Sequence, residues 1–291
     1  MNKTIKKKLK VLIVVGIIIL VGIVVAIPKS TYEKWFGNNP QEDSPIVENR
    51  KTALVYVKNS AGLLVGLEAP ITEEVNDDIR EKWDIMTKHA SSLPNGYTTT
   101  INVNTILNEY VINEGILELY VTSDITSSDG RKTAEAIAWT YINDEISEVK
   151  LFVDDIEVKK INDYTITKIT KKMGINLEYE TSYLFESTST TVVYYETEYM
   201  LPVTYFHTET DVCSYILEKT LVQANITENS SFEYDLQEDV MVINFVDNIE
   251  LNENVLMSLT ESFDLNFNLS KLSINNVEKT LYEAVFNEIE E

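Results

Sequence analysis

The chain has 291 residues, of which 24 are basic and 47 acidic, so its formal net charge at pH 7 is −23. This charge excludes nucleic acid as a partner, because phosphates would be repelled. Cys213 is the one cysteine, which excludes an internal disulfide and leaves burial as the source of stability.

The N-terminal segment predicts a membrane anchor. Residues 1–10 contain five lysines, and residues 11–28 are an apolar run without a charged side chain. As a helix this run spans roughly 25 Å, close to the hydrocarbon thickness of a bilayer. The positive-inside rule keeps residues 1–10 as a cytoplasmic tail and places the rest outside the cytoplasm. The alternative is a cleaved signal peptide, with Val24 and Ala26 as the small residues before the cut.

The part of the chain beyond the predicted anchor is strongly acidic. Without the five N-terminal lysines it holds 19 basic and 47 acidic residues, a net charge of −28. This charge favours solubility and, among protein partners, a basic protein over self-association. Residues 29–51 contain two prolines and mixed charges without apolar periodicity, which predicts a tether.

Residues 52–160 predict a small α+β domain. Segments 53–59 and 63–71 predict a hairpin, and an apolar stripe at helical spacing predicts a helix after it. Strands are then expected at 97–103 and 116–122, a second helix near 134–142 and a closing strand at 149–153. The stripe of the first helix consists of Val75, Ile79, Trp83, Met86 and Ala90.

The same order recurs over residues 190–291. Segment 192–206 resembles the first hairpin, and 239–249 aligns without gaps on 115–125. We therefore predict a tandem repeat whose second copy is divergent. Between the copies, residues 161–189 predict a structured connector, in which an alternating run at 175–185 forms a strand that pairs with 164–170.

These residues carry a family resemblance. The motif positions are Leu93-Pro94-Asn95-Gly96 after the first helix, Ser123-Asp124 after a strand, Thr140 in the second helix and Val153-Asp154 at the end of the closing strand. This succession resembles the GerM (GerMN) domain family of sporulation and spore germination proteins, closely over 53–158 and faintly over 191–277. The resemblance implies membrane-attached extracytoplasmic proteins with tandem copies, no catalysis and a role in assembly. A transmembrane anchor stands here where many relatives have a lipid-modified cysteine.

The sequence predicts no catalytic, cofactor-binding or metal-binding residue. His89 and His207 are the two histidines, one in each copy, so a site built from both would have to span the two domains. Cys213 lies in an apolar helical pattern and is predicted to be a buried structural thiol. Segment 124–130 resembles a calcium loop, but its glycine comes one position late and no bidentate glutamate follows, so we predict a turn and a helix start.

The predicted fold is α+β: a transmembrane helix followed by two small domains, each a mixed or antiparallel sheet with two helices on one face. The predicted function is a non-enzymatic, membrane-anchored extracytoplasmic scaffold or interaction protein of the bacterial cell envelope. A cell-wall glycan-binding module is the first alternative, suggested by tyrosines that are predicted mainly to pack a sheet face. A hydrolase is the second, and it requires a cleft with a carboxylate of raised pKa. The tyrosines concerned include Tyr179, Tyr183, Tyr194, Tyr195, Tyr199 and Tyr205.

Overall fold

The computed structural model describes residues 52–71, 77–88, 92–181, 184–195, 199–226, 231–277 and 280–286, all within one compact unit of the chain, Lys51–Glu291. The predicted anchor and tether, residues 11–51, lie outside the described residues. Within the described ranges, no helix has the length and apolar character needed to cross a membrane.

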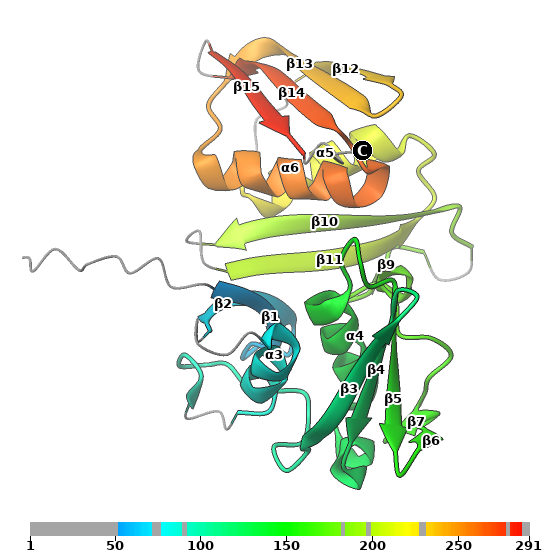
Figure 1. The fold of residues 1–291 in the computed structure, drawn as a ribbon. Coiled ribbons are helices and arrows are strands. Elements are labelled where there is room, and N and C mark those ends of the chain that lie inside the picture. The colour runs from blue at the N-terminus through cyan, green and yellow to red at the C-terminus, as the bar shows by residue number, and fades with distance from the viewer. Residues whose placement is uncertain are drawn as a thin grey trace, which may run out of the picture. The chain divides into compact units, whose positions relative to one another are not determined.

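The same order of elements occurs twice (Figure 1). The first copy comprises β1 (Thr52–Lys58), β2 (Leu64–Pro70), α3 (Asp78–Met86), β3 (Leu107–Asn113), β4 (Ile116–Val121), α4 (Gly130–Tyr141), β5 (Glu148–Val153) and β6 (Ile156–Glu157). The second comprises β10 (Ser187–Tyr195), β11 (Tyr199–His207), α5 (Val212–Gln223), β12 (Phe232–Gln237), β13 (Val240–Ile249), α6 (Glu253–Phe267), β14 (Lys271–Val277) and β15 (Thr280–Val285). The predicted tandem repeat is confirmed.

The two copies also agree in strand register. The sheets β3-β4-β5-β6 and β12-β13-β14-β15 each have a parallel central pair between two antiparallel pairs. Ile116 and Val240 each follow a two-residue turn, and they pair with Glu148 and Lys271, the first residues of the next strands. The ungapped alignment read from the sequence therefore superimposes equivalent positions of the two ladders.

The expectation of one sheet per domain is wrong. The hairpins of both copies join into a shared sheet of order β1-β2-β11-β10, with β9 (Glu178–Tyr179) beside β11. The antiparallel contact of β2 with β11 pairs Gly66 with Met200 and Leu67 with Tyr199. An isolated two-stranded hairpin is marginally stable, and four strands bury more apolar surface. The hydrophobic alternation of each hairpin is the same in either arrangement.

The helices fill the space between the shared sheet and the sheet of their own copy. In the first copy α4 packs against both β1 and β5, and in the second α5 and α6 pack against β10. Trp83, Leu119 and Ile137 belong to the core of the first copy, and Phe245 and Phe263 to that of the second; all five are at most 1% exposed.

The predicted hairpin in the connector is wrong. Short strand β8 (Tyr164–Thr165) pairs instead with β7 (Lys160–Ile161), and β9 runs parallel to β11. Gly174 and Asn176 have φ values of +74° and +47°, which interrupt the extended backbone that the alternating pattern predicted. Ile175, between them, is buried and exchanges hydrogen bonds with Thr204 of β11: Thr204 N–H donates to the Ile175 carbonyl at 2.9 Å, and Ile175 N–H donates to the Thr204 hydroxyl at 3.0 Å. The connector is structured, but it packs on the shared sheet rather than on itself.

Candidate functional site

The contact between the two copies ends at a proline. Continuing the β2–β11 register places Pro202 opposite Leu64, and proline has no N–H with which to extend the ladder. The carboxamide of Asn176 takes its place. Its Nδ2 donates to the carbonyls of Leu64 and Pro202 at 2.7 and 2.8 Å, and its Oδ1 accepts the Leu64 N–H at 2.8 Å. Asn176 is 4% exposed, so a buried side chain of the connector completes the joint between the copies.

A polar network from α4 holds Asn176 in position. Lys132 Nζ donates to Asn176 Oδ1 at 3.1 Å, and Glu135 Oε2 accepts the Asn176 N–H at 3.3 Å. Glu135 is 2% exposed and is paired with Arg131 at 2.6 Å, while Arg131 also donates to the Met173 carbonyl. Burial lowers the pKa of the Lys132 ammonium. Because the buried Glu135 carboxylate and the half-buried Lys132 ammonium each have a partner, the network favours one arrangement of α4, the connector and the shared sheet.

The outer edge of β10 is covered by a polar stripe on α6. Three side chains spaced four residues apart on the helix accept hydrogen bonds from alternate backbone N–H groups of the strand. The pairs are Ser258 with Tyr194 at 3.0 Å, Ser262 with Val192 at 2.8 Å and Asn266 with Thr190 at 3.0 Å. An edge that would otherwise present unpaired donors is therefore closed within the chain.

The opposite edge, β1, is covered in the same way by the first copy. Thr140 of α4 accepts the N–H of Tyr56 at 3.1 Å, in a buried position. Tyr56 matches Tyr194 in the sequence alignment of the hairpins, so the two helices cap equivalent strand positions. This contact gives the threonine of the GerMN-like pattern a structural reason. Together with the Lys58–Thr98 pair, it covers the C-terminal half of β1.

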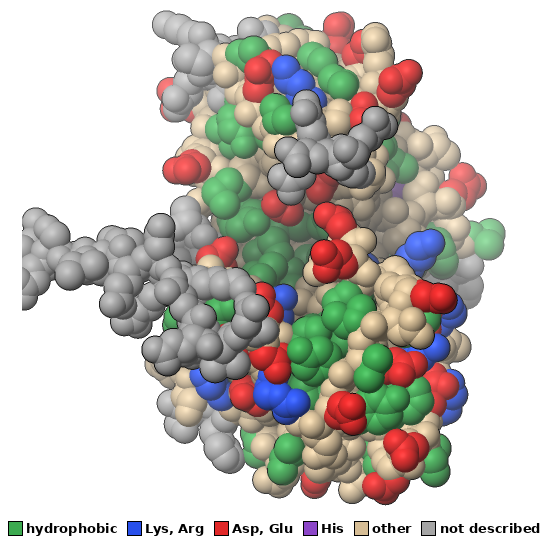
Figure 2. All heavy atoms as spheres, viewed as in Figure 1, with side chains coloured by type: hydrophobic (Ala, Val, Ile, Leu, Met, Phe, Trp, Pro, Cys, Tyr) green, Lys and Arg blue, Asp and Glu red, His purple; other side chains and the backbone are tan. Residues whose placement is uncertain are grey.

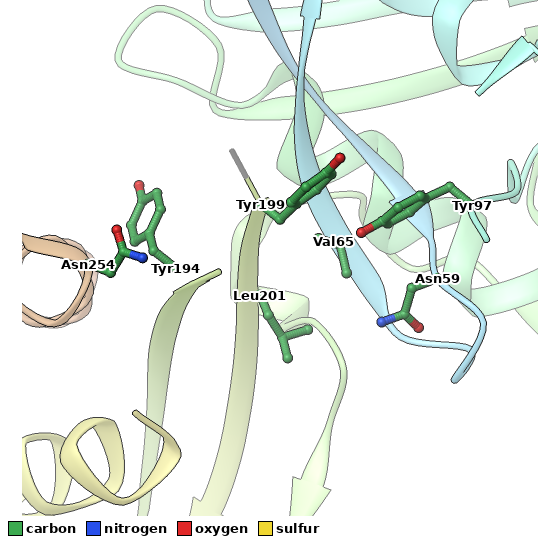
Figure 3. A pocket seen from close by; sticks show the side chains of 7 residues that line it. All are labelled: Asn59, Val65, Tyr97, Tyr194, Tyr199, Leu201 and Asn254. Carbon is green, nitrogen blue, oxygen red and sulfur yellow. The ribbon is translucent and has the colours of Figure 1, made fainter. Parts of the chain in front are cut away.

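A hollow of about 400 Å³ lies beside the joint (Figure 3). It is lined by Asn59, Val65, Tyr97, Tyr194, Tyr199, Leu201 and Asn254, which come from both copies. The rings of Tyr97 and Tyr199 are stacked, with centroids 5.4 Å apart and an angle of 7° between their planes.

The Leu93–Gly96 motif places Tyr97 at this hollow. Gly96 has a φ of +91°, a conformation that favours glycine, and the N–H of Tyr97 donates to the Pro94 carbonyl at 3.2 Å. Thr98 then exchanges two backbone hydrogen bonds of 2.8 Å with Lys58 at the end of β1. The motif is a turn that returns the chain to the edge of the shared sheet.

The other motif positions are structural as well. Ser123 and Asp124 begin a short 3-10 helix, Ser123–Ser127. Asp154 and Asp155, with φ values of +49° and +63°, form the tight turn from β5 to β6. The predicted turn and helix start at 124–130 are confirmed, with Asp129 at the N-cap of α4 and ion-paired with Lys58.

β12 is the outermost strand of its own sheet, and among the described residues no strand pairs with its outer edge. The N–H of Val246 donates to the Ser231 carbonyl at 2.8 Å, so every second residue from Ser231 onward is bonded to β13. The backbone groups of Phe232, Tyr234 and Leu236 therefore point away from the sheet. In the equivalent strand β3, Ile112 occupies the position of Leu236.

The chemically reactive side chains of the second copy are buried. His207 and Ser189 are 0% and 1% exposed, with 2.8 Å between the ring Nε2 and the hydroxyl. Burial lowers the pKa of His207, whose ring stacks on Tyr215 with centroids 3.6 Å apart. Cys213 is 4% exposed and lies 3.9 Å from the Met241 sulfur, and burial raises the pKa of its thiol to about 12. His89 lies outside the described residues. Among those that are described, no three His, Cys, Asp or Glu side chains are grouped to hold a metal ion.

Sequence reasoning missed both the α6 stripe that covers β10 and the residue that completes the joint. The α6 stripe could have been found, since two serines and an asparagine recur every four residues along an apolar helix. Asn176 gives no such signal, because a lone asparagine in an alternating run also fits a strand exposed to solvent.

No protein-family model matches the chain, and no curated protein matches its sequence. Its structure is similar to the solved tandem GerMN domains of the sporulation protein GerM from Bacillus subtilis, with a TM-score of 0.66 and 17% identity, over 79% of this chain and 92% of that one. The first GerMN domain of the same protein, taken alone, aligns with 42% of this chain and 98% of its own length at 17% identity, with a TM-score of 0.38. The resemblance read from the sequence is confirmed at the level of fold: this chain carries tandem GerMN-like domains.

Proposed function

We propose that this protein is a non-enzymatic scaffold of the bacterial cell envelope, anchored in the membrane by residues 11–28, that binds a basic envelope protein along the edge of β12. The observation that carries the proposal is the contrast between edges. Three N–H groups of β10 are bonded to α6, and β1 is covered at Tyr56 by Thr140 and at Lys58 by Thr98. Within the described part of the chain, β12 by contrast presents outward N–H and C=O groups at three successive alternate residues. An open edge of this kind accepts an added strand.

The charge around β12 defines the partner. The strand and the turn after it carry Glu233, Asp235, Glu238 and Asp239 and contain no lysine or arginine. Acidic side chains also outnumber basic ones on the face shown in Figure 2. An extended segment with lysine or arginine side chains complements this edge, and self-association through it would bring like charges together.

The proposal of a non-enzymatic role is supported by the position of the titratable groups. Among the described residues, Glu261 and Asp264 of α6 are the carboxyl groups whose pKa values are raised by burial, as a hydrolase would require of one acid. Neither lines the hollow at the joint. The Ser189–His207 pair is too deeply buried for a substrate to reach. The fold shared with GerM supports a role in sporulation.

A photo-cross-linking amino acid at position 236 tests the edge directly. Leu236 is 39% exposed on β12, and Val222 on α5, which is 67% exposed, serves as the matched control. In intact cells we expect a cross-linked protein adduct from position 236 that is absent from position 222. The yield of this adduct should fall as the salt concentration is raised, because the contact is electrostatic in part.

A proline substitution separates backbone pairing from side-chain contact. Leu236→Pro removes an outward N–H but leaves the ladder with β13 intact, so we expect the protein to fold and the adduct from a neighbouring position to be lost. Ile112→Pro is the control, because Ile112 has the equivalent position on β3, where Arg80 already covers the first carbonyls of the edge. Equal adducts from positions 236 and 222, or an adduct insensitive to Leu236→Pro, would rule out binding along β12.

The proposed membrane topology predicts a protease result. Five lysines before the apolar run should hold the N-terminus in the cytoplasm, so protease added to intact spheroplasts is expected to digest residues 52–291. A cytoplasmic marker protein should survive in the same sample. Protection of residues 52–291 until the membrane is dissolved would refute the extracytoplasmic placement.

A further inference from the structure

We propose that the hollow beside the joint binds an uncharged N-acetylated oligosaccharide. The scaffold proposal concerns β12, and the hollow lies on the other side of α5 and α6, at the shared sheet. The two proposals rest on different residues and stand independently.

The size and lining of the hollow fit a small ligand. Its volume of about 400 Å³ falls within the range of roughly 300–1,000 Å³ that small-ligand sites occupy. Val65 and Leu201 form an apolar base where β2 meets β11, and the stacked pair Tyr97–Tyr199 lies to one side (Figure 3). Aromatic side chains can pack against the C–H face of a pyranose ring, which is the apolar side of a sugar.

Two carboxamides supply the polar contacts. Oδ1 of Asn59 accepts the N–H groups of Ala61 and Leu63, both at 3.0 Å, which fixes the orientation of the amide. Its Nδ2 then points toward the hollow, as Figure 3 shows. Asn254, from the first turn of α6, lies across the hollow beside Tyr194. A carboxamide both donates and accepts hydrogen bonds. It therefore complements hydroxyl and acetamido groups, whether these donate or accept.

The electrostatics select an uncharged ligand. None of the seven lining residues carries a charge, so a charged ligand would lose hydration without gaining an ion pair. Burial, with Glu261 and Glu68 nearby, raises the pKa of Tyr194, which keeps its phenol protonated as a donor. The same carboxylates repel an anionic sugar. A neutral ligand with one apolar face and several hydroxyl or amide groups remains, and N-acetylated sugars have this chemistry.

Saturation-transfer NMR with N,N′,N″-triacetylchitotriose and the full chain in detergent micelles tests the proposal. We expect transfer to the sugar, strongest at ring C–H protons, and about tenfold weaker binding in Tyr199→Ala, the loss expected for one aromatic contact. Tyr199→Phe keeps the ring and should bind like the natural chain. Tyr120→Ala is the matched control, because Tyr120 is also stacked, on Phe152 in the first copy, but lies outside the hollow.

Three further measurements test separate parts of the proposal. Tyr199 pairs in the joint, so thermal unfolding of Tyr199→Ala accompanies the binding measurement. Asn254→Ala, which leaves the joint intact, should weaken binding about fivefold through loss of a hydrogen bond. Maltotriose, which lacks acetamido groups, should bind more weakly. Absence of transfer to the natural chain, equal binding by Tyr199→Ala, Asn254→Ala and the natural chain, or equal binding of maltotriose would overturn the proposal. None of these outcomes bears on β12.

Discussion

Replacing Asn176 with alanine is expected to lower the free energy of unfolding by about 3–5 kcal/mol. The change leaves the N–H and C=O of Leu64 and the C=O of Pro202 without the partner that Asn176 provides in a buried position, at about 1–3 kcal/mol for each unsatisfied group before relaxation. Alanine also tolerates the φ of +47° at this position less well than asparagine. Urea-induced unfolding followed by tryptophan fluorescence gives the difference directly.

Two further variants separate the causes of this loss. Asn176→Gly accepts the positive φ but lacks the carboxamide, so it should recover only about 1 kcal/mol relative to alanine. Asn176→Asp keeps the acceptor for the Leu64 N–H and for Lys132 but cannot donate to the two carbonyls. Because its second carboxylate oxygen would face those two carbonyl oxygens in a buried position, we expect it to be at least as destabilising as alanine. If glycine restored full stability, the role of Asn176 would be one of backbone conformation, and the joint would not depend on its amide.

The second large effect is expected at Ser262. Ser262→Ala removes the acceptor of the buried Val192 N–H, a 2.8 Å hydrogen bond, and should cost about 2–3 kcal/mol. Hydrogen exchange provides a residue-specific measurement, because the Val192 amide is expected to lose protection while amides of β12 keep theirs. Thr260→Ala on the same helix is the control, since the Thr260 hydroxyl bonds to the Leu256 carbonyl and to Tyr282 of β15 and not to β10. Unchanged protection at Val192 would show that α6 covers the strand without bonding to it.

The sequence predicted most of what depends on local pattern, but the strand expected at 97–103 is wrong: that segment is a loop with one bridge at Thr98, and the strand is β3, Leu107–Asn113. The alternation in 115–125 and 239–249 determines which face of each strand is buried, so it also determines the register, and the structure agrees. The shared sheet could not be predicted in this way. The apolar alternation of β2 is satisfied by any strand beside it, and the choice of β11 depends on contacts more than a hundred residues apart, such as that of Asn176 with Leu64.

The candidate site shows the same division. Thr140 and Leu93–Gly96 were singled out by family pattern, but their roles as a cap for Tyr56 and as the turn that places Tyr97 required the fold. Cys213 was placed correctly as a buried thiol because the apolar pattern that indicates its burial lies within its own helix. The hollow is lined by residues of two hairpins, the turn after α3 and the helix α6, and no pattern within any one of these four segments predicts it.

The β2–β11 contact limits how copies of this domain can be gained or lost during evolution. The two hairpins pair through β2 and β11, and hydrogen bonds from α4 and α6 cover parts of the outer strands β1 and β10. The helices of the two copies therefore limit extension of the sheet within one polypeptide. A single copy released from its neighbour would expose the edge of β2 or β11 and pair with any other copy that offers the same edge. Because the connector holds both hairpins together at high local concentration, pairing within the chain outcompetes exchange between chains. Copies added by duplication would therefore be expected in pairs, since each new hairpin edge needs a second copy beside it.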